Sequence, residues 1–135
     1  TLFKSPDDHI ILPEVISKEP LGAYVKQGDN HWRDIVTMVG YALIDAEELK
    51  VTQTNAKELA SQTKNVSVKR LLGTEGDLGA GLGLTKDWAL KAIQATGNYG
   101  EIFSRHVGAN SPLKFERGAN ALYTDGGLMY SPPFR

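Results

Sequence analysis

A glycine-rich stretch in the middle of the chain is the first place where residue types and spacing could do chemistry. Gly79, Gly81 and Gly83 alternate with other residues, and backbone amides without side chains can bind phosphate at the start of a helix. The stretch lacks a Gly-Lys-Ser/Thr ending and a complete dinucleotide fingerprint, and no convincing strand precedes it. We therefore interpret it as a turn-rich connection between helices, where glycine supplies backbone freedom.

Imidazoles and carboxylates give no recognisable catalytic pattern. His9, His31 and His106 are far apart, and none has a second ligand at helical spacing, so a zinc site is poorly supported. His31 is most simply a solvated side chain. Glu47 and Glu48 are adjacent, so they point to different parts of a helix surface and favour a charged face over an acid/base pair.

Serine, cysteine and tryptophan residues also give no recognisable catalytic pattern. No serine lies in a Gly-x-Ser-x-Gly elbow, which argues against a hydrolase triad, and cysteine is absent. Trp32 and Trp88 could line a ligand pocket, but both lie at helical positions where core packing is the commoner role. The sequence therefore predicts no catalytic residue, no metal site and no cofactor.

Composition indicates an ordinary globular chain. Its 135 residues are 41% hydrophobic and 23% charged, and the formal net charge is -1, so the charge balance argues against nucleic acid as a partner. No apolar run reaches the roughly 18 to 20 residues that span a bilayer. The length suffices for one hydrophobic core.

Short extended segments are predicted before residue 28 and helices after it. Residues 9–12, 15–18 and 21–26 are expected to be strands, although strands need partners on their edges to be stable. A long helix is expected over 30–49, capped by Asp29 or Asn30. Its apolar face consists of Trp32, Ile35, Val36, Val39, Leu43 and Ala46.

Capping patterns indicate further short helices. Asn55 with Glu58 resembles a capping box that opens a helix to about residue 62, and residues 66–72 form another turn or two. A helix over 86–96 ends at a glycine, and Asn98 with Glu101 is a second capping box. After Val107 the chain is rich in Gly, Pro, Asn and Ser, which predicts an extended tail that needs a surface to pack on.

Three separated segments carry a resemblance to a known family. They are ILPEVISKEPLG at 11–22, GNYGEIF at 97–103 and DGGLMYSPPFR at 125–135. In this order they resemble the general L-amino-acid-binding proteins of polar amino-acid ABC importers, and the resemblance covers essentially the whole chain. Those proteins are two-lobed and well over twice as long, so the chain resembles only their C-terminal part.

The resemblance implies an α/β fold of the type II periplasmic-binding-protein class, incomplete and with a helix-rich C-terminal portion. Residues 1–22 would be the end of the second lobe and the hinge crossover, 23–107 the C-terminal part of the first lobe, and 108–135 an extension packing on that lobe. The hinge candidates nearest the ligand cleft are Glu19, Pro20 and Leu21. The principal ligand residues are expected upstream of Thr1, in a longer precursor with a signal peptide.

The implied function is capture of free L-amino acids in the periplasm and delivery to the permease subunits of an ABC importer, without covalent chemistry. Two alternatives stay open: a periplasmic-binding-like enzyme such as a dehydratase, and an independent helical interaction module. For the 135-residue chain alone we also expect self-association, since another copy could cover its strand edges and apolar helix faces.

Overall fold

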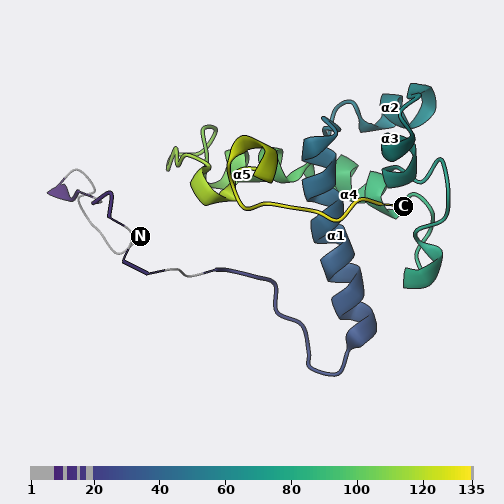
Figure 1. Cartoon of the computed structure of the whole chain (residues 1–135), viewed down its shortest axis with the longest axis horizontal. Coiled ribbons are helices and arrows are strands. Elements are labelled where there is room, and N and C mark those ends of the chain that lie inside the picture. Colours follow the sequence, from purple (N-terminus) through teal and green to yellow (C-terminus); the bar gives the residue numbers. More distant parts are fainter. Residues whose placement is uncertain (1–7, 11, 15, 18–19, 135) are drawn as a thin grey trace.

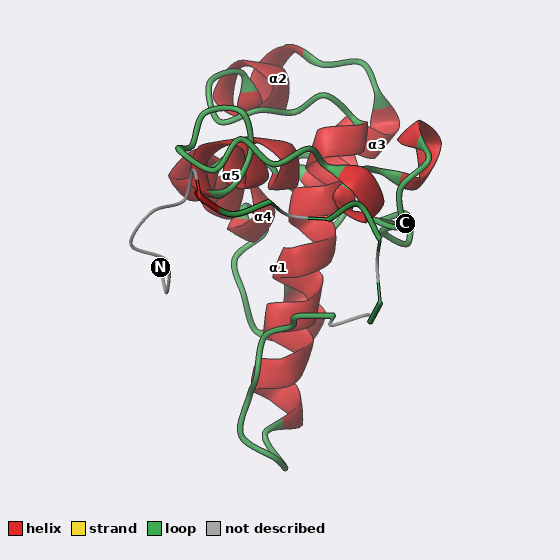
Figure 2. Ribbon diagram, turned by 90° about the vertical axis from the view of Figure 1, so that its left-hand side faces the viewer, coloured by secondary structure: helices red, strands yellow, loops and turns green. Residues whose placement is uncertain are grey.

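The computed structural model describes residues 8–10, 12–14, 16–17 and 20–134. Within these residues the chain forms α-helices and short 3-10 helices joined by loops, with no strand (Figures 1 and 2). The α-helices are α1 (Asn30–Glu48), α2 (Ala56–Gln62), α3 (Val66–Leu71), α4 (Trp88–Thr96) and α5 (Tyr99–His106), and the 3-10 helices are η2 (Ala80–Leu82), η3 (Gly118–Asn120) and η4 (Tyr123–Asp125).

The long helix α1 organises the molecule. It begins where the Asp29 side chain accepts a hydrogen bond of 3.0 Å from the backbone N–H of Trp32, which confirms the predicted cap. Its C-terminal half is buried, with Ala42 and Ala46 fully covered, whereas its N-terminal half projects beyond the other helices (Figure 1). The fully buried part of α1 is thus confined to its C-terminal half.

A single hydrophobic core surrounds the C-terminal half of α1. α3, α4 and η2 contribute large apolar side chains to it, α2 contributes Ala56, and Trp88 at the start of α4 is buried as predicted. Its buried members are Ala42, Ala46, Val51, Ala56, Val68, Leu71, Leu72, Leu82, Trp88, Ala89, Ile93 and Phe134. Small alanines on α1, Ala42 and Ala46, leave room for the neighbouring helices to pack against it.

Residues with local capping signals end α4 and begin α5. Gly97 ends α4 with a φ of 80°, a conformation that favours glycine. The Asn98 side chain accepts from the backbone N–H of Glu101 at 2.9 Å, and the Glu101 carboxylate accepts from the backbone N–H of Asn98 at 2.8 Å. The second predicted capping box is therefore confirmed.

The first predicted capping box is wrong. Asn55 has a helical backbone conformation and makes no side-chain cap to α2. Its side chain instead accepts from the Thr52 N–H at 2.7 Å and donates to the Lys50 carbonyl at 3.0 Å. A cap residue with an extended backbone directs its side chain toward the amides of the first helical turn. Because the backbone of Asn55 is helical, its side chain instead hydrogen-bonds within the preceding turn.

The strand predictions are not supported by the described residues. Residues 21–26 and the described positions of 9–12 and 15–18 form no strand, while Ile11, Val15 and Lys18 lie outside the described residues. Of the predicted α/β fold, the described residues therefore form only helices. The physical reason is that a strand exists through hydrogen bonds to a neighbouring strand, and the described chain supplies none.

The predicted burial of Trp32 is also wrong. It was expected in the core as part of the apolar face of α1, yet 51% of it is exposed. The helical periodicity is real, but the described chain covers this face only near the C-terminal end of α1. Spacing shows which side of a helix is apolar, and it does not show whether anything packs on it.

The tail after Val107 returns to the helices. Leu122 is buried, and Phe134 joins the core, with its ring centroid 6.2 Å from that of Trp88. The tail crosses in front of α1 before reaching this position (Figure 1). The division of the chain at residues 22 and 107 stays a prediction.

Candidate functional site

Of the predicted hinge residues, Pro20 and Leu21 are described, and neither belongs to a polar cluster of the described chain. Pro20 is exposed, 98% of Leu21 is exposed, and Glu19 lies outside the described residues. Neither described residue has a side-chain interaction within this part of the molecule. Their role beside a ligand cleft therefore stays a prediction.

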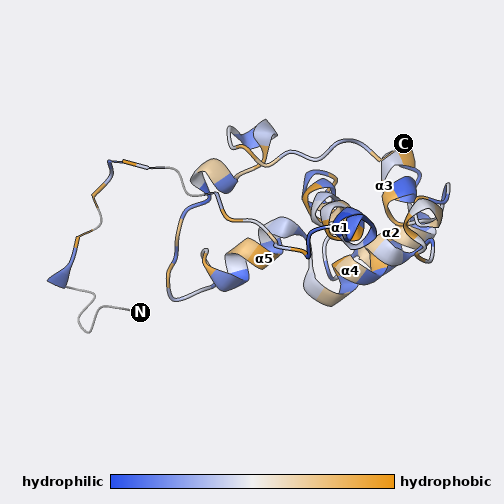
Figure 3. Cartoon of the chain, turned by 90° about the horizontal axis from the view of Figure 1, so that it is seen from below, coloured by the Kyte–Doolittle hydropathy of each residue, from blue (hydrophilic) through white to orange (hydrophobic). Residues whose placement is uncertain are grey.

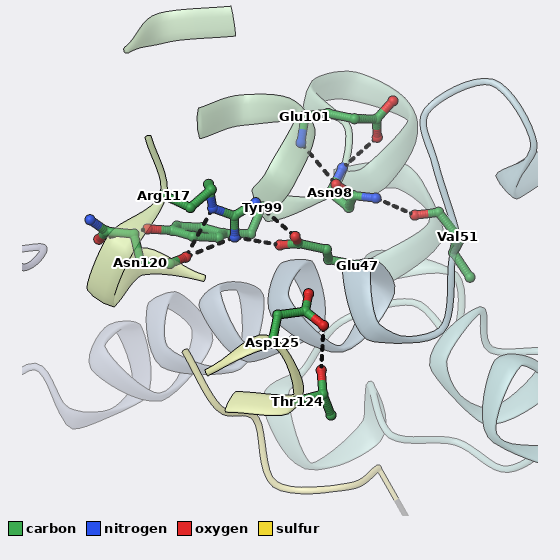
Figure 4. A network of polar contacts seen from close by, with 9 residues as sticks. All are labelled: Glu47, Val51, Asn98, Tyr99, Glu101, Arg117, Asn120, Thr124 and Asp125. Carbon is green, nitrogen blue, oxygen red and sulfur yellow. Dashed lines mark hydrogen bonds and ion pairs between the residues drawn. The ribbon is translucent and has the colours of Figure 1, made fainter. Parts of the chain in front are cut away.

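The most developed polar site lies where the tail meets α1 and α5 (Figure 4). The Arg117 guanidinium donates to both carboxylate oxygens of Glu47, at 2.8 and 3.1 Å. Both side chains are largely buried. Two parallel charge-assisted hydrogen bonds fix the direction of the arginine as well as its position.

Aromatic rings and a backbone carbonyl complete the surroundings of Arg117. Its Cζ lies 5.3 Å from the ring centroid of Tyr99 and 5.2 Å from that of Phe103, so both rings, which are one turn apart on α5, contribute cation–π attraction. It also donates to the carbonyl oxygen of Asn120 at 2.7 and 3.0 Å. We call Arg117, Glu47, Tyr99, Phe103 and Asn120 the Arg117 cluster.

A second network joins the start of α5 to the segment after α1. Asn98 is buried and donates to the carbonyl oxygen of Val51 at 2.9 Å. The Glu101 carboxylate also accepts from the backbone N–H of Gln53 at 3.0 Å. The capping box therefore satisfies two backbone groups of the segment after α1 as well as those of its own helix, which fixes α5 against the end of α1.

An open pocket of about 540 Å³ lies between the two networks. It is lined by Glu47, Asn98, Gly100, Glu101, Ser104, Arg105, Asn110 and Arg117. Its principal charged groups are already engaged, because Arg117 pairs with Glu47 and Arg105 donates to the Thr96 carbonyl at 2.9 Å. The arrangement is suited to holding the tail in place.

Among the described residues, Asp45 is the titratable side chain whose pKa burial raises most clearly. Only 8% of it is exposed, and burial, followed by the charge of Glu48, raises its pKa from 3.8 to about 6. Glu48 also accepts a hydrogen bond of 3.4 Å from the Tyr123 hydroxyl and raises the pKa of that group. The adjacent glutamates thus bind different partners, Glu47 binding Arg117 and Glu48 binding Tyr123, because they point to different parts of the helix surface.

His31 is not simply solvated. Its Nε2 lies 2.9 Å from the carbonyl oxygen of Leu82, so it ties the first turn of α1 to η2. Across residues 8–10, 12–14, 16–17 and 20–134, no three His, Cys, Asp or Glu side chains are placed to hold a metal ion. In the same ranges no helix is both long and apolar enough to cross a bilayer.

Comparison with known proteins gives matches that run along nearly the whole chain. The "General L-amino acid-binding periplasmic protein AapJ" of Rhizobium johnstonii is 56% identical over an alignment of 135 positions that covers 98% of this chain and 39% of that protein. The "Glutamate/glutamine/aspartate/asparagine-binding protein BztA" of Rhodobacter capsulatus is 54% identical over 128 residues, 95% of this chain and 38% of that protein. The chain is a homologue of the C-terminal part of such binding proteins.

A solved structure supports the same conclusion. The "ABC transporter / periplasmic binding protein from Brucella ovis with glutathione bound" is 52% identical and matches 98% of this chain with a TM-score of 0.92, while the match covers 41% of that protein. The chain therefore spans about two fifths of the length of the relatives that it matches. No family model matches the chain. The resemblance read from the three sequence segments is confirmed, and the fold matches part of that periplasmic binding protein.

Sequence reasoning missed the Arg117 cluster. Asn98 and Glu101 carry a local capping signal three residues apart, and that signal found them. Arg117 and Glu47 are separated by 70 positions, and no periodicity or motif connects them. A single arginine beside a glycine in a tail is a weak signal, so only the folded chain could reveal the pair.

Proposed function

We propose that the protein containing this chain is the solute-binding component of an ABC importer. It captures L-amino acids in the periplasm and delivers them to the permease subunits in the membrane. The observation that carries the proposal is the 56% identity to the Rhizobium johnstonii amino-acid-binding protein over 98% of the chain. Identity at this level along the full chain supports a shared fold and a shared mode of action.

The role of the described residues in this function is to build a rigid lobe. The Arg117 cluster and the capping box fasten the tail and α5 to α1, and Phe134 anchors the end of the tail in the core. A binding protein that closes by hinge motion needs lobes that move as rigid bodies. These contacts supply that rigidity, and Pro20 and Leu21 belong to the proposed hinge.

Ligand recognition in this proposal is noncovalent, and the protein is not an enzyme. A guanidinium would bind the ligand carboxylate through two hydrogen bonds, and an acidic group would bind its ammonium. Neither role falls to Arg117 or Glu47, since these residues already pair with one another at 2.8 Å. The ligand-binding groups are proposed to lie in the part of the protein outside this chain.

A second ligand class is favoured by one specific observation. The Brucella ovis structure contains glutathione, whose γ-glutamyl end carries the free α-carboxylate and α-ammonium of an amino acid. A cleft that recognises those two groups could accept both amino acids and γ-glutamyl peptides. Binding of glutathione is therefore the alternative to binding of free amino acids.

Isothermal titration calorimetry of the full gene product tests the proposal. We expect micromolar or tighter binding of at least one common L-amino acid, with the D-enantiomer much weaker because both charged groups must be matched at once. Glutathione is titrated in parallel, and the 135-residue chain alone is the control that should give no binding heat. Turnover of the ligand, or the absence of binding across the whole panel, would contradict the proposal.

A further inference from the structure

The turn of η4 contains a dipeptide that occurs nowhere else in the chain. Asp125 is followed by Gly126, and no other aspartate and no asparagine precedes a glycine. This pair is prone to a reaction of its own, because glycine has no Cβ to hinder the attack of its backbone nitrogen on the preceding carboxyl group. Following the tail back from its C-terminus in Figure 3 leads to this turn, which lies at the edge of the molecule.

Both reacting groups are exposed and weakly held. Asp125 and Gly126 are exposed, and the Asp125 carboxylate accepts one hydrogen bond from the described chain, of 3.5 Å from the Thr124 hydroxyl (Figure 4). The Gly126 N–H donates to the Tyr123 carbonyl oxygen at 3.3 Å, which is beyond the usual range of such bonds. The carboxyl group is therefore free to rotate toward the amide nitrogen, and that nitrogen loses little when its own bond opens.

We propose that Asp125 is a site of spontaneous isomerisation to isoaspartate. The Gly126 nitrogen attacks Cγ of the protonated Asp125 carboxyl group, the N–Cγ bond forms, and a carboxyl oxygen leaves as water with the carboxyl proton and the amide proton. Water then opens the resulting succinimide ring. Breaking the bond from the nitrogen to the backbone carbonyl carbon gives isoaspartate, whereas breaking the N–Cγ bond restores aspartate. The net reaction needs no oxidant or cofactor, and the product has the mass of the original chain.

Isomerisation lengthens the main chain by one methylene group inside a closed turn. The Tyr123 N–H donates to the Met129 carbonyl oxygen at 2.9 Å, and the Met129 N–H donates to the Ala121 carbonyl oxygen at 3.0 Å. Gly127 lies so close to the Ala121 carbonyl that an added Cβ would overlap it. Because the closed turn has no room for a longer chain, we expect isoaspartate to open these bonds and loosen the tail where it leaves the turn.

Mass spectrometry of the full gene product after storage tests the proposal. The folded protein is kept at physiological temperature and neutral pH, sampled over several weeks and digested. Reversed-phase chromatography separates the aspartate and isoaspartate forms of the peptide that contains Asp125, and electron-transfer fragments identify them. We expect isoaspartate to form at least about tenfold faster at Asp125 than at Asp77, because Asp77 is equally exposed but is followed by leucine.

Two substitutions separate this reaction from general ageing of the protein. Asp125→Glu keeps the charge but lengthens the side chain, so the five-membered ring cannot form and no isomer should accumulate. Asp125→Asn forms the same ring with loss of ammonia and should convert faster than the original protein. In the stored original protein, the amides of Tyr123 and Met129 should exchange hydrogen at least about tenfold faster than before storage. In stored Asp125→Glu their exchange should be unchanged.

Two results would overturn the proposal. One is the absence of isoaspartate at position 125 in the stored protein, and conversion of a synthetic peptide of residues 119–131 under the same conditions would then show that the folded turn blocks the reaction. The other is isoaspartate without faster exchange at Tyr123 and Met129, which would overturn the loosening of the tail. Neither result depends on which ligand the protein binds, so both are distinct from a failure of the proposed function.

Discussion

Replacing Asp45 by asparagine should stabilise the chain at neutral pH. The carboxyl group is buried in α1 and stands near Glu48, and both effects disfavour its charged form. Asparagine has nearly the same shape and no charge, so Asp45→Asn removes the cost of keeping a carboxylate out of water. The change therefore tests whether burial at this position acts as the structure indicates.

The size and sign of the effect follow from the pKa of Asp45 in the two states. It is about 6 in the folded chain and 3.8 when burial is absent, a difference of two units that corresponds to about 3 kcal/mol. The folded chain binds more protons between these values, so the contribution of Asp45 to stability is full below pH 3.8 and is lost as the pH rises through about 6. The benefit of Asp45→Asn should thus approach 3 kcal/mol near pH 7.5 and vanish near pH 4.

Urea unfolding at a series of pH values measures this difference. The free energy of unfolding of Asp45→Asn minus that of the original chain is plotted against pH, and the midpoint of the curve gives the folded pKa. A carbon-detected NMR titration of the Asp45 carboxyl provides an independent midpoint near 6. In Glu48→Gln this midpoint should move lower, because the neighbouring charge is the second cause of the shift.

A surface carboxyl provides the control. Glu116 is exposed, so Glu116→Gln should change the free energy of unfolding by less than about 0.5 kcal/mol at every pH. A benefit of Asp45→Asn that stays constant from pH 4 to about pH 7.5 would refute the reasoning, as would an NMR midpoint near 3.8. Either result would mean that the carboxylate is solvated in the folded chain.

Three further expectations concern the contacts that hold the tail. A double-mutant cycle of Arg117→Ala and Glu47→Ala, followed by urea unfolding, should give a coupling free energy of about 1 to 3 kcal/mol. The coupling should persist in high salt because the pair is mostly buried. A coupling of zero would mean that the tail is held elsewhere. Gly127→Ala should destabilise the chain by more than about 2 kcal/mol because the added Cβ would overlap a backbone carbonyl, whereas Gly40→Ala, in open space on α1, should stabilise it by up to about 1 kcal/mol. Phe134→Ala should cost about 3 kcal/mol through the cavity left in the core, and thermal unfolding unchanged from the original chain would show that the tail end does not pack.

The helices that the sequence predicted correctly share local signals. Asp29 caps α1, Gly97 ends α4 and Asn98 with Glu101 opens α5, each within a few residues of the element it controls. Asn55 carried a similar pattern and failed, because its own backbone was already helical. Capping depends on the backbone conformation of one residue, and that conformation can be changed by the turn before it.

Sequence patterns alone thus determined the resemblance to amino-acid-binding proteins, the helical periods and most helix boundaries, since these depend on residues close together along the chain. Tertiary structure decided which apolar faces are covered and which distant groups pair. It buried Trp88 but left Trp32 half exposed, and it joined Arg117 to Glu47 across 70 positions. Burial and long-range pairing depend on where other segments lie in space, and extended segments such as residues 21–26 become strands only when a neighbour supplies hydrogen bonds.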